Sequence, residues 1–195
     1  MLFGFLATAA LAVLTIPVEA IRDRQQFKVQ VKVTQGNKKF DGLWASLYHT
    51  GAATADVYFQ NDRSKAFSAF LNHTQFQWAY TGVPNIPYAL NLQYQTYSAW
   101  GPLEVTPGYG EDYYGKGFKF GKGNSIVDTF EEWTGWLGNY TLSSVYLLWQ
   151  LLIRETKNLL VCDWWHQVPQ LFWTQVGFDL EVIPTCAKVN LIAKT

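Results

Sequence analysis

The sequence carries little net charge and few charged residues of any kind. Its 15 Lys and Arg residues balance its 15 Asp and Glu residues, and these four types make up 15% of the 195 residues. A near-neutral chain has no electrostatic reason to bind nucleic acid or an anionic membrane surface. We therefore expect no nucleic-acid partner.

Long apolar runs are missing except at the N-terminus. Residues 2–16 are predominantly apolar and are followed by Pro17 and the small-residue end Val18-Glu19-Ala20. This order is typical of a secretory signal peptide cut after Ala20, although no Lys or Arg precedes the run. A membrane anchor is the less favoured alternative, because a bilayer span needs roughly 20 apolar residues. We predict a signal peptide over residues 1–20, a secreted single domain over residues 21–195, and no membrane span after signal removal.

Cysteine is also scarce, with Cys162 and Cys186 as the two in the chain. In an exported protein an even pair is most simply a disulfide. On the chain-entropy estimate, closing this loop would stabilise the folded state by about 3.5 kcal/mol. A reactive thiol is the alternative, and it would need an activating partner.

Motifs for metal, phosphate or nucleophilic chemistry are absent. His49, His73 and His166 are scattered along the chain without a second ligand at helical spacing, so we expect no metal site. There is no G-x-S-x-G elbow. The glycine-rich segment 108–125 fits neither a dinucleotide-binding fingerprint nor a phosphate-binding loop. We expect no cofactor.

Two-residue alternation of apolar and polar side chains is abundant, and it is the pattern of strands with one buried face. It predicts strands at 27–33, 89–97 and 187–193. The segment at 145–153 is apolar on both faces, which favours a central strand and leaves a short buried helix as the alternative. Shorter β-like runs lie at 43–49, 56–60, 76–80, 159–164 and 178–183.

Turn residues separate these runs, at 35–39, 81–87 and 101–110, while residues 63–72 and 125–136 resemble short helices. No internal repeat is visible. The pattern predicts an all-β chain, a single-domain β-sandwich or jelly-roll-like fold with one or two short helices and one disulfide.

Aromatic residues make up 17% of the chain, and we expect most of them in the core. Five lie within or after the flexible glycine-rich segment 108–125, and binding residues tend to sit on such loops. They could stack on sugars or bury against a protein partner. These candidate ligand-binding residues are Tyr109, Tyr113, Tyr114, Trp133 and Trp136.

A carbohydrate-active enzyme is the alternative function, since glycoside hydrolysis needs two facing carboxylates. The candidates are the pairs Glu111 with Asp112 and Glu131 with Glu132. They fall in a glycine loop and at a predicted helix start, whereas such enzymes hold their carboxylates on rigid elements. We therefore assign no catalytic residue.

Two N-glycosylation triplets begin at Asn72 and Asn139, and a secreted eukaryotic chain would carry them at its surface.

The stretch CDWWHQVPQLFW at 162–173 groups conspicuous residues. Strand alternation places Cys162 and Trp164 on one face. We predict that Trp164 packs beside the bridge as core, which leaves Trp165 and His166 nearer the surface.

Three stretches, LYHTGAATADVYF at 47–59, CDWWHQVPQLFW at 162–173 and CAKVNL at 186–191, together resemble a family of short secreted fungal proteins of unassigned function. The resemblance implies secretion, a β-rich fold and a disulfide between Cys162 and Cys186, and it brings no catalytic residues. The residues and the resemblance together predict an extracellular binding protein, of which a secreted effector is one form, with an unknown protein or glycan partner.

Overall fold

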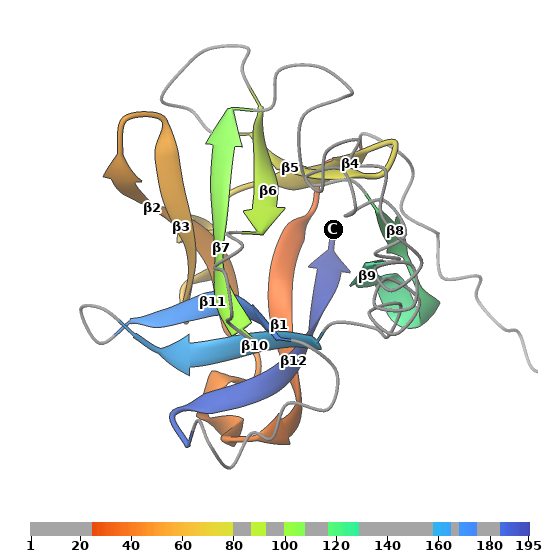
Figure 1. Cartoon of the computed structure of the whole chain (residues 1–195). Helices are drawn as coiled ribbons and strands as arrows, with labels where there is room; N and C mark the ends of the chain where they lie inside the picture. The colour runs from red at the N-terminus through yellow and green to blue at the C-terminus, as the bar shows by residue number, and fades with distance from the viewer. Residues whose placement is uncertain are drawn as a thin grey trace, which may run out of the picture.

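The computed structural model describes residues 25–79, 87–92, 100–107, 117–128, 158–164, 168–174 and 184–195 (Figure 1). Twelve strands lie in these ranges, and all their pairings are antiparallel. In chain order they are β1 (Lys28–Gly36), β2 (Trp44–Gly51), β3 (Thr54–Gln60), β4 (Ala69–Asn72), β5 (Gln75–Trp78), β6 (Tyr88–Leu92), β7 (Trp100–Pro107), β8 (Phe118–Phe120), β9 (Ser125–Asp128), β10 (Asn158–Asp163), β11 (Pro169–Thr174) and β12 (Cys186–Lys194).

Six of the strands form a closed ring. β12 pairs with β1 and β9, β9 pairs with β8, and β4 pairs with β5. Phe27, immediately before β1, bridges to Ala69 in β4. The Phe118 N–H donates to the Thr74 carbonyl at 2.9 Å, which joins β8 to the start of β5. The ring β1-β4-β5-β8-β9-β12 is therefore a barrel without a free edge.

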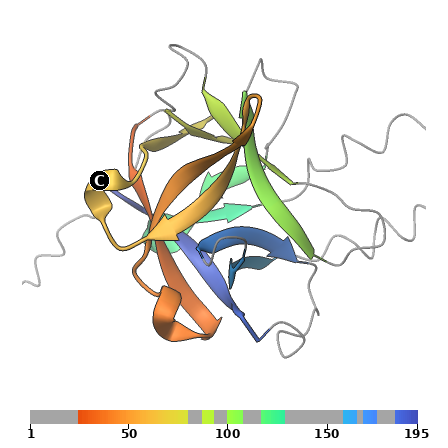
Figure 2. The same ribbon diagram turned by 90° about the vertical axis from the view of Figure 1, so that its left-hand side faces the viewer.

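The other six strands form three hairpins, β2–β3, β6–β7 and β10–β11. The second strand of each hairpin pairs with the other two, as β3 with β7, β7 with β11, and β11 with β3. Figure 2 shows the β2–β3 hairpin facing the viewer. A six-stranded barrel capped by a triangle of hairpins is the arrangement called a β-trefoil, built from three successive units of four strands.

The registers within the cap show this threefold relation at single residues. Val57 in β3, Leu103 in β7 and Leu171 in β11 are central, are at most 1% exposed, and belong to the main core. In each pairing, the residue that precedes the central residue of one strand lies opposite the residue that follows the central residue of the neighbouring strand. The three pairs are Asp56 with Glu104, Pro102 with Phe172, and Gln170 with Tyr58. Because side chains alternate along a strand, these six lie on the outer face of the cap.

The main core fills the barrel and follows the alternation of its strands. In β1 the side chains of Val29, Val31 and Val33 are at most 2% exposed. Phe27, Phe76 and Phe118 come from different strands or their flanks and pack ring to ring, with Phe76 at 6.2 Å from Phe27 and 5.6 Å from Phe118. Burial of such large apolar side chains is the main stabilising contribution to the fold.

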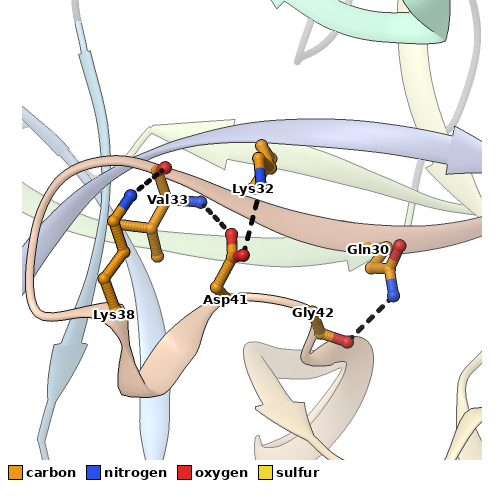
Figure 3. A network of polar contacts seen from close by, with 6 residues as sticks. All are labelled: Gln30, Lys32, Val33, Lys38, Asp41 and Gly42. Atoms are coloured by element: carbon orange, nitrogen blue, oxygen red, sulfur yellow. Dashed lines mark hydrogen bonds and ion pairs between the residues drawn. The ribbon is translucent and has the colours of Figure 1, made fainter.

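The connection from β1 to β2 is fixed by a polar network, because these strands pair directly only at Gln30 and Trp44. Figure 3 shows Asp41 accepting the Val33 N–H at 2.8 Å and an ion pair from Lys32 at 3.2 Å. The Gln30 amide donates to the Gly42 carbonyl at 3.0 Å. The Val33 N–H, followed by the lysine, lowers the pKa of Asp41 despite its partial desolvation.

The predicted all-β class with one disulfide is confirmed: Cys162 and Cys186 are bonded, and one antiparallel sheet holds the twelve strands. Within that class, the pairings describe a closed barrel with a hairpin cap rather than two facing layers. The segments at 145–153 and 178–183 lie outside the described residues.

The predicted helix at 63–72 is wrong. Arg63–Lys65 is a single 3-10 turn capped by Asp62, and Ala69–Asn72 is strand β4. Ala69 and Leu71 are buried while Phe70 between them is not, so the segment follows a period of two once it pairs with β5. The helix expected at 125–136 begins as strand β9, and its remainder lies outside the described residues. In the described ranges helical structure is confined to 3-10 turns at 38–40, 63–65 and 122–124.

Two further strands lie where we expected loops. Strand β7 occupies most of the 101–110 segment, and β8 lies inside the glycine-rich segment. Leu103, Val105 and Phe118 supply the buried positions that hold these strands in the sheet.

Gly36 tests how tightly the end of β1 is packed against β12. Its φ is +92°, and a Cβ there would meet the Cys186 carbonyl oxygen at 3.0 Å. We predict that Gly36→Ala lowers the free energy of unfolding by about 2 kcal/mol, from left-handed backbone strain plus the close contact. Gly123→Ala is the matched control, because Gly123 has a φ of +67° and nothing within 4 Å of an added Cβ. Chemical denaturation of both variants measures the difference, and equal losses would contradict the close packing.

Candidate ligand-binding pocket at the hairpin cap

The aromatic residues proposed from the sequence lie outside the described residues. This applies to Tyr109, Tyr113, Tyr114, Trp133 and Trp136, and equally to the candidate carboxylates Glu111, Asp112, Glu131 and Glu132. It also applies to Trp165, His166 and Asn139. Their roles stay predictions.

A pocket of about 190 Å³ opens on the outer side of the cap, where the β2–β3 and β10–β11 hairpins meet. It is smaller than the roughly 300–1,000 Å³ of a drug-sized site, so its size suits one ring or one head group. Its lining residues are Tyr48, Thr50, Asp56, Tyr58, Trp164, Val168 and Gln170.

Strand alternation explains how two hairpins supply these side chains. Tyr48 and Thr50 are alternate residues of β2, and Asp56 and Tyr58 are alternate residues of β3. Tyr48 lies directly opposite Asp56 in the register. All four therefore share the outer face, while the residues between them on β3, such as Val57, enter the core.

The pocket holds two exposed aromatic rings. Tyr48 is 52% exposed and Trp164 is 49% exposed, and these are the large apolar side chains that stand exposed in the described ranges. Tyr58 packs edge-on against Tyr48 at 6.4 Å between ring centres. Exposed aromatic side chains gathered at one pocket mark a binding surface, since folding alone gives no reason to place them together.

Trp164 is positioned by a small second core outside the barrel. This core contains Leu160, Phe172 and the Cys162–Cys186 disulfide, with Trp100 packed against it. The Trp164 ring lies 5.2 Å from Phe172 and 5.6 Å from Trp100, edge to face in both cases. The backbone N–H of Trp164 donates to the Val168 carbonyl at 3.3 Å.

The prediction that Trp164 is core is therefore wrong. Alternation does place it on the same side as Cys162, but that side is the outer face of the cap. One edge of the indole rests on the second core while the rest of the ring reaches solvent.

The polar side of the pocket is built around Asp56. Asp56 lies directly opposite Glu104 on β7, and the Gln170 amide donates a hydrogen bond to its carboxylate. Partial burial, followed by the nearby Glu104 charge, raises the pKa of Asp56 to about 6, while the Gln170 bond opposes the rise. The carboxyl thus changes charge near neutral pH and can either donate or accept a hydrogen bond.

Tyr48, Asp56 and Tyr58 were not among the binding residues predicted from the sequence, although the stretch 47–59 supported the family resemblance. The available signal was an aromatic residue at an alternate, solvent-side strand position next to apolar core positions, as in Leu47-Tyr48 and Val57-Tyr58. What the sequence could not supply was the pairing of β3 with β11, which brings Gln170 and Trp164 to the same place.

The remaining sequence candidates are dispersed. His49 is exposed in β2, and His73 occupies the tight turn between β4 and β5 with a φ of +54°. Among the described residues no group of three or more His, Cys, Asp and Glu is placed to hold a metal ion. Asn72 ends β4 just before that turn and is partly exposed, and its glycosylation stays a prediction.

A family model described as a domain of unknown function (DUF7907) matches residues 24–195. The match agrees with the resemblance to a family of unassigned function. No curated protein matches the chain, and no solved structure does. In the described part of the chain, no helix has the length and apolar character needed to cross a membrane.

The raised pKa of Asp56 has a consequence for stability. In the folded state the Asp56 carboxyl binds its proton more tightly than in the unfolded chain, where its pKa is 3.8. Ionisation of Asp56 therefore lowers the free energy of unfolding, and this loss grows as pH rises from about 4 to about 6 and is complete above it. We predict that Asp56→Asn stabilises the protein by about 1 kcal/mol at pH 7.5, discounted for solvent screening, and by little at pH 4.

Denaturation of both proteins across this pH range measures the difference. The variant Glu104→Gln provides a second check. Removal of the neighbouring charge should lower the pH at which ionisation of Asp56 reduces stability, relative to the wild-type protein. A stability difference that is independent of pH would contradict this account of Asp56.

Proposed function

Since the chain belongs to the DUF7907 family, whose description assigns no activity, the geometry of its pocket carries the functional argument, and we propose that the protein is a secreted, extracellular glycan-binding protein. One observation carries the proposal: both large apolar side chains that stand exposed in the described ranges, Tyr48 and Trp164, line the same pocket. The predicted signal peptide at residues 1–20 and the disulfide support the extracellular location.

The chemistry of the pocket suits a sugar ring. An exposed indole offers a flat apolar face for the C–H side of a pyranose, and Trp164 is held in place by Phe172 and Trp100. Asp56, Gln170 and Thr50 supply carboxylate, amide and hydroxyl groups for the sugar hydroxyls. A site with a supported aromatic wall and fixed polar groups loses little conformational entropy on binding.

The proposal predicts that Trp164→Ala weakens glycan binding at least tenfold, about 1.4 kcal/mol, because the stacking surface is lost. A glycan array identifies the ligand, and titration calorimetry measures the affinity of the wild-type and variant proteins. Trp44→Ala is the control, since Trp44 is a partly exposed tryptophan of β2 that packs against Arg63 outside the pocket. Retention of no glycan by the wild-type protein, or equal losses in the two variants, would overturn the proposal.

One observation favours a second candidate, glycoside hydrolysis. Asp56 and Glu104 lie directly opposite each other on paired strands, where Cβ atoms are about 4.5–5.5 Å apart. Retaining glycosidases hold two carboxyl groups about 5–5.5 Å apart, and one of the two carries a raised pKa. Glu104 lies outside the pocket lining, however, which favours binding over catalysis.

We predict that the wild-type protein releases no new reducing ends from any oligosaccharide it binds, because only one of the two carboxylates faces the pocket. Product analysis after prolonged incubation at pH 5 to 7 measures this. If reducing ends appear and Asp56→Asn abolishes them, hydrolysis replaces simple binding as the function.

A further inference from the structure

Among the described residues that line the pocket, the charged one is acidic. Asp56 lines it, and Glu104 lies directly opposite Asp56 on the neighbouring strand. The described lining contains neither lysine nor arginine. Two basic side chains of the nearby 3-10 turns at 38–40 and 63–65 have partners elsewhere: Lys39 pairs with Asp163, and Arg63 stacks on Trp44 and donates to the C-terminal Thr195 carbonyl.

Three aromatic rings line the same pocket as this acidic group. Tyr48 and Tyr58 stand at an interplanar angle of 89°, so they form two walls of a corner, and Trp164 contributes from the other hairpin. Aromatic rings attract cations through their electron-rich faces, and several rings around one position are the usual means of holding an alkylated ammonium group. An aromatic enclosure beside a carboxylate is thus complementary to a positive charge that carries apolar substituents.

From this arrangement we propose that the pocket binds an organic ammonium ion, presented either by an amino sugar or by a quaternary ammonium compound. The inference deepens the proposed function, because it names the chemistry of the ligand group that enters the same site.

The charges near the pocket favour a cation over a neutral or an anionic ligand. Two carboxyl groups on adjacent strands repel each other, and Gln170 offers Asp56 a dipole but no charge. A bound ammonium ion relieves that repulsion, whereas a neutral ligand leaves it and an anion adds to it. The hydrogen bond from Gln170 orients the Asp56 carboxylate, so this acceptor is already in place before the ligand arrives.

The size of the pocket limits what enters it. A volume of about 190 Å³ admits one head group or one ring. Because the pocket is open, the rest of a longer ligand would extend over the surface of the cap.

Matched ligand pairs test the proposal on the full secreted protein. Choline and 3,3-dimethylbutan-1-ol have nearly the same shape, but only choline is charged. Glucosamine oligomers and their N-acetylated counterparts differ in the same way at each sugar. We expect the charged member of at least one pair to bind at least tenfold more tightly than its neutral partner in titration calorimetry at pH 6.5, where both Asp56 and the amino groups carry charge.

Two variants connect that preference to the pocket. Asp56→Asn should weaken binding of the charged ligand at least tenfold more than it weakens binding of the neutral partner. Asp62→Asn is the control, because it removes the same charge from a 3-10 turn outside the pocket and asparagine caps a turn about as well as aspartate does. Thermal melts confirm that both variants are folded.

The outcomes separate this inference from the glycan proposal. Equal affinity for the charged and neutral members of both pairs, or no binding of any of the four ligands, overturns the ammonium inference. Equal binding of both sugar oligomers, with no preference for choline over its neutral partner, overturns the ammonium inference while supporting glycan recognition. Binding of choline without any sugar supports the ammonium inference and overturns glycan recognition. A tenfold loss in Asp62→Asn equal to that in Asp56→Asn also overturns the inference, because the effect would then come from net charge.

Discussion

The disulfide between Cys162 and Cys186 connects the cap hairpin that carries Trp164 to the strand that closes the barrel. Cys162 and Cys186 lie opposite each other in the pairing of β10 with β12, so the covalent bond and the backbone ladder fix the same register. A one-residue slip of β10 would turn Leu160 and Cys162 to the wrong face. The bridge therefore holds in place the second core on which Trp100, Phe172 and Trp164 pack. Gly36 extends this dependence to β1, which passes close to the Cys186 carbonyl.

The all-β class and the disulfide could be predicted from the sequence, because alternation and cysteine count are local properties. Strands β1, β2, β3 and β12 coincide closely with the runs expected at 27–33, 43–49, 56–60 and 187–193. The ring closure was not predictable, since it rests on pairings such as Phe27 with Ala69 that join distant parts of the chain. The segment 63–72 shows the same limit, because its apolar residues fit a helix until β5 pairs with it.

The candidate site shows why the sequence pattern did not locate the pocket. The glycine-rich segment was the expected source of binding aromatic residues, whereas the described pocket takes Tyr48 and Tyr58 from strands β2 and β3 and Trp164 from the position after β10. Tyr48 and Trp164 are far apart in sequence and meet because β3 and β11 pair once, at Tyr58 and Gln170. Nothing in either stretch alone marks that meeting. The stretch at 162–173 contributes both to the core and to the pocket. Cys162 and Phe172 belong to the disulfide cluster, while Trp164, Val168 and Gln170 line the pocket.

The location of the pocket follows from the threefold construction of the cap. Each of the three central strands must place an apolar residue into the shared core, and Val57, Leu103 and Leu171 meet that demand in the same way. The outer face carries no such demand, so its equivalent positions differ: Asp56, Pro102 and Gln170 before the centre, and Tyr58, Glu104 and Phe172 after it. Phe172 joins the disulfide cluster, while Asp56 lies opposite Glu104 and has a raised pKa, so its ionised form is the less favourable one in the folded state. A half-buried carboxyl group beside exposed aromatic rings does not arise from the requirements of folding, because an apolar or neutral side chain would be more stable there. The unfavourable charge at Asp56 is consistent with a ligand that supplies the missing positive charge.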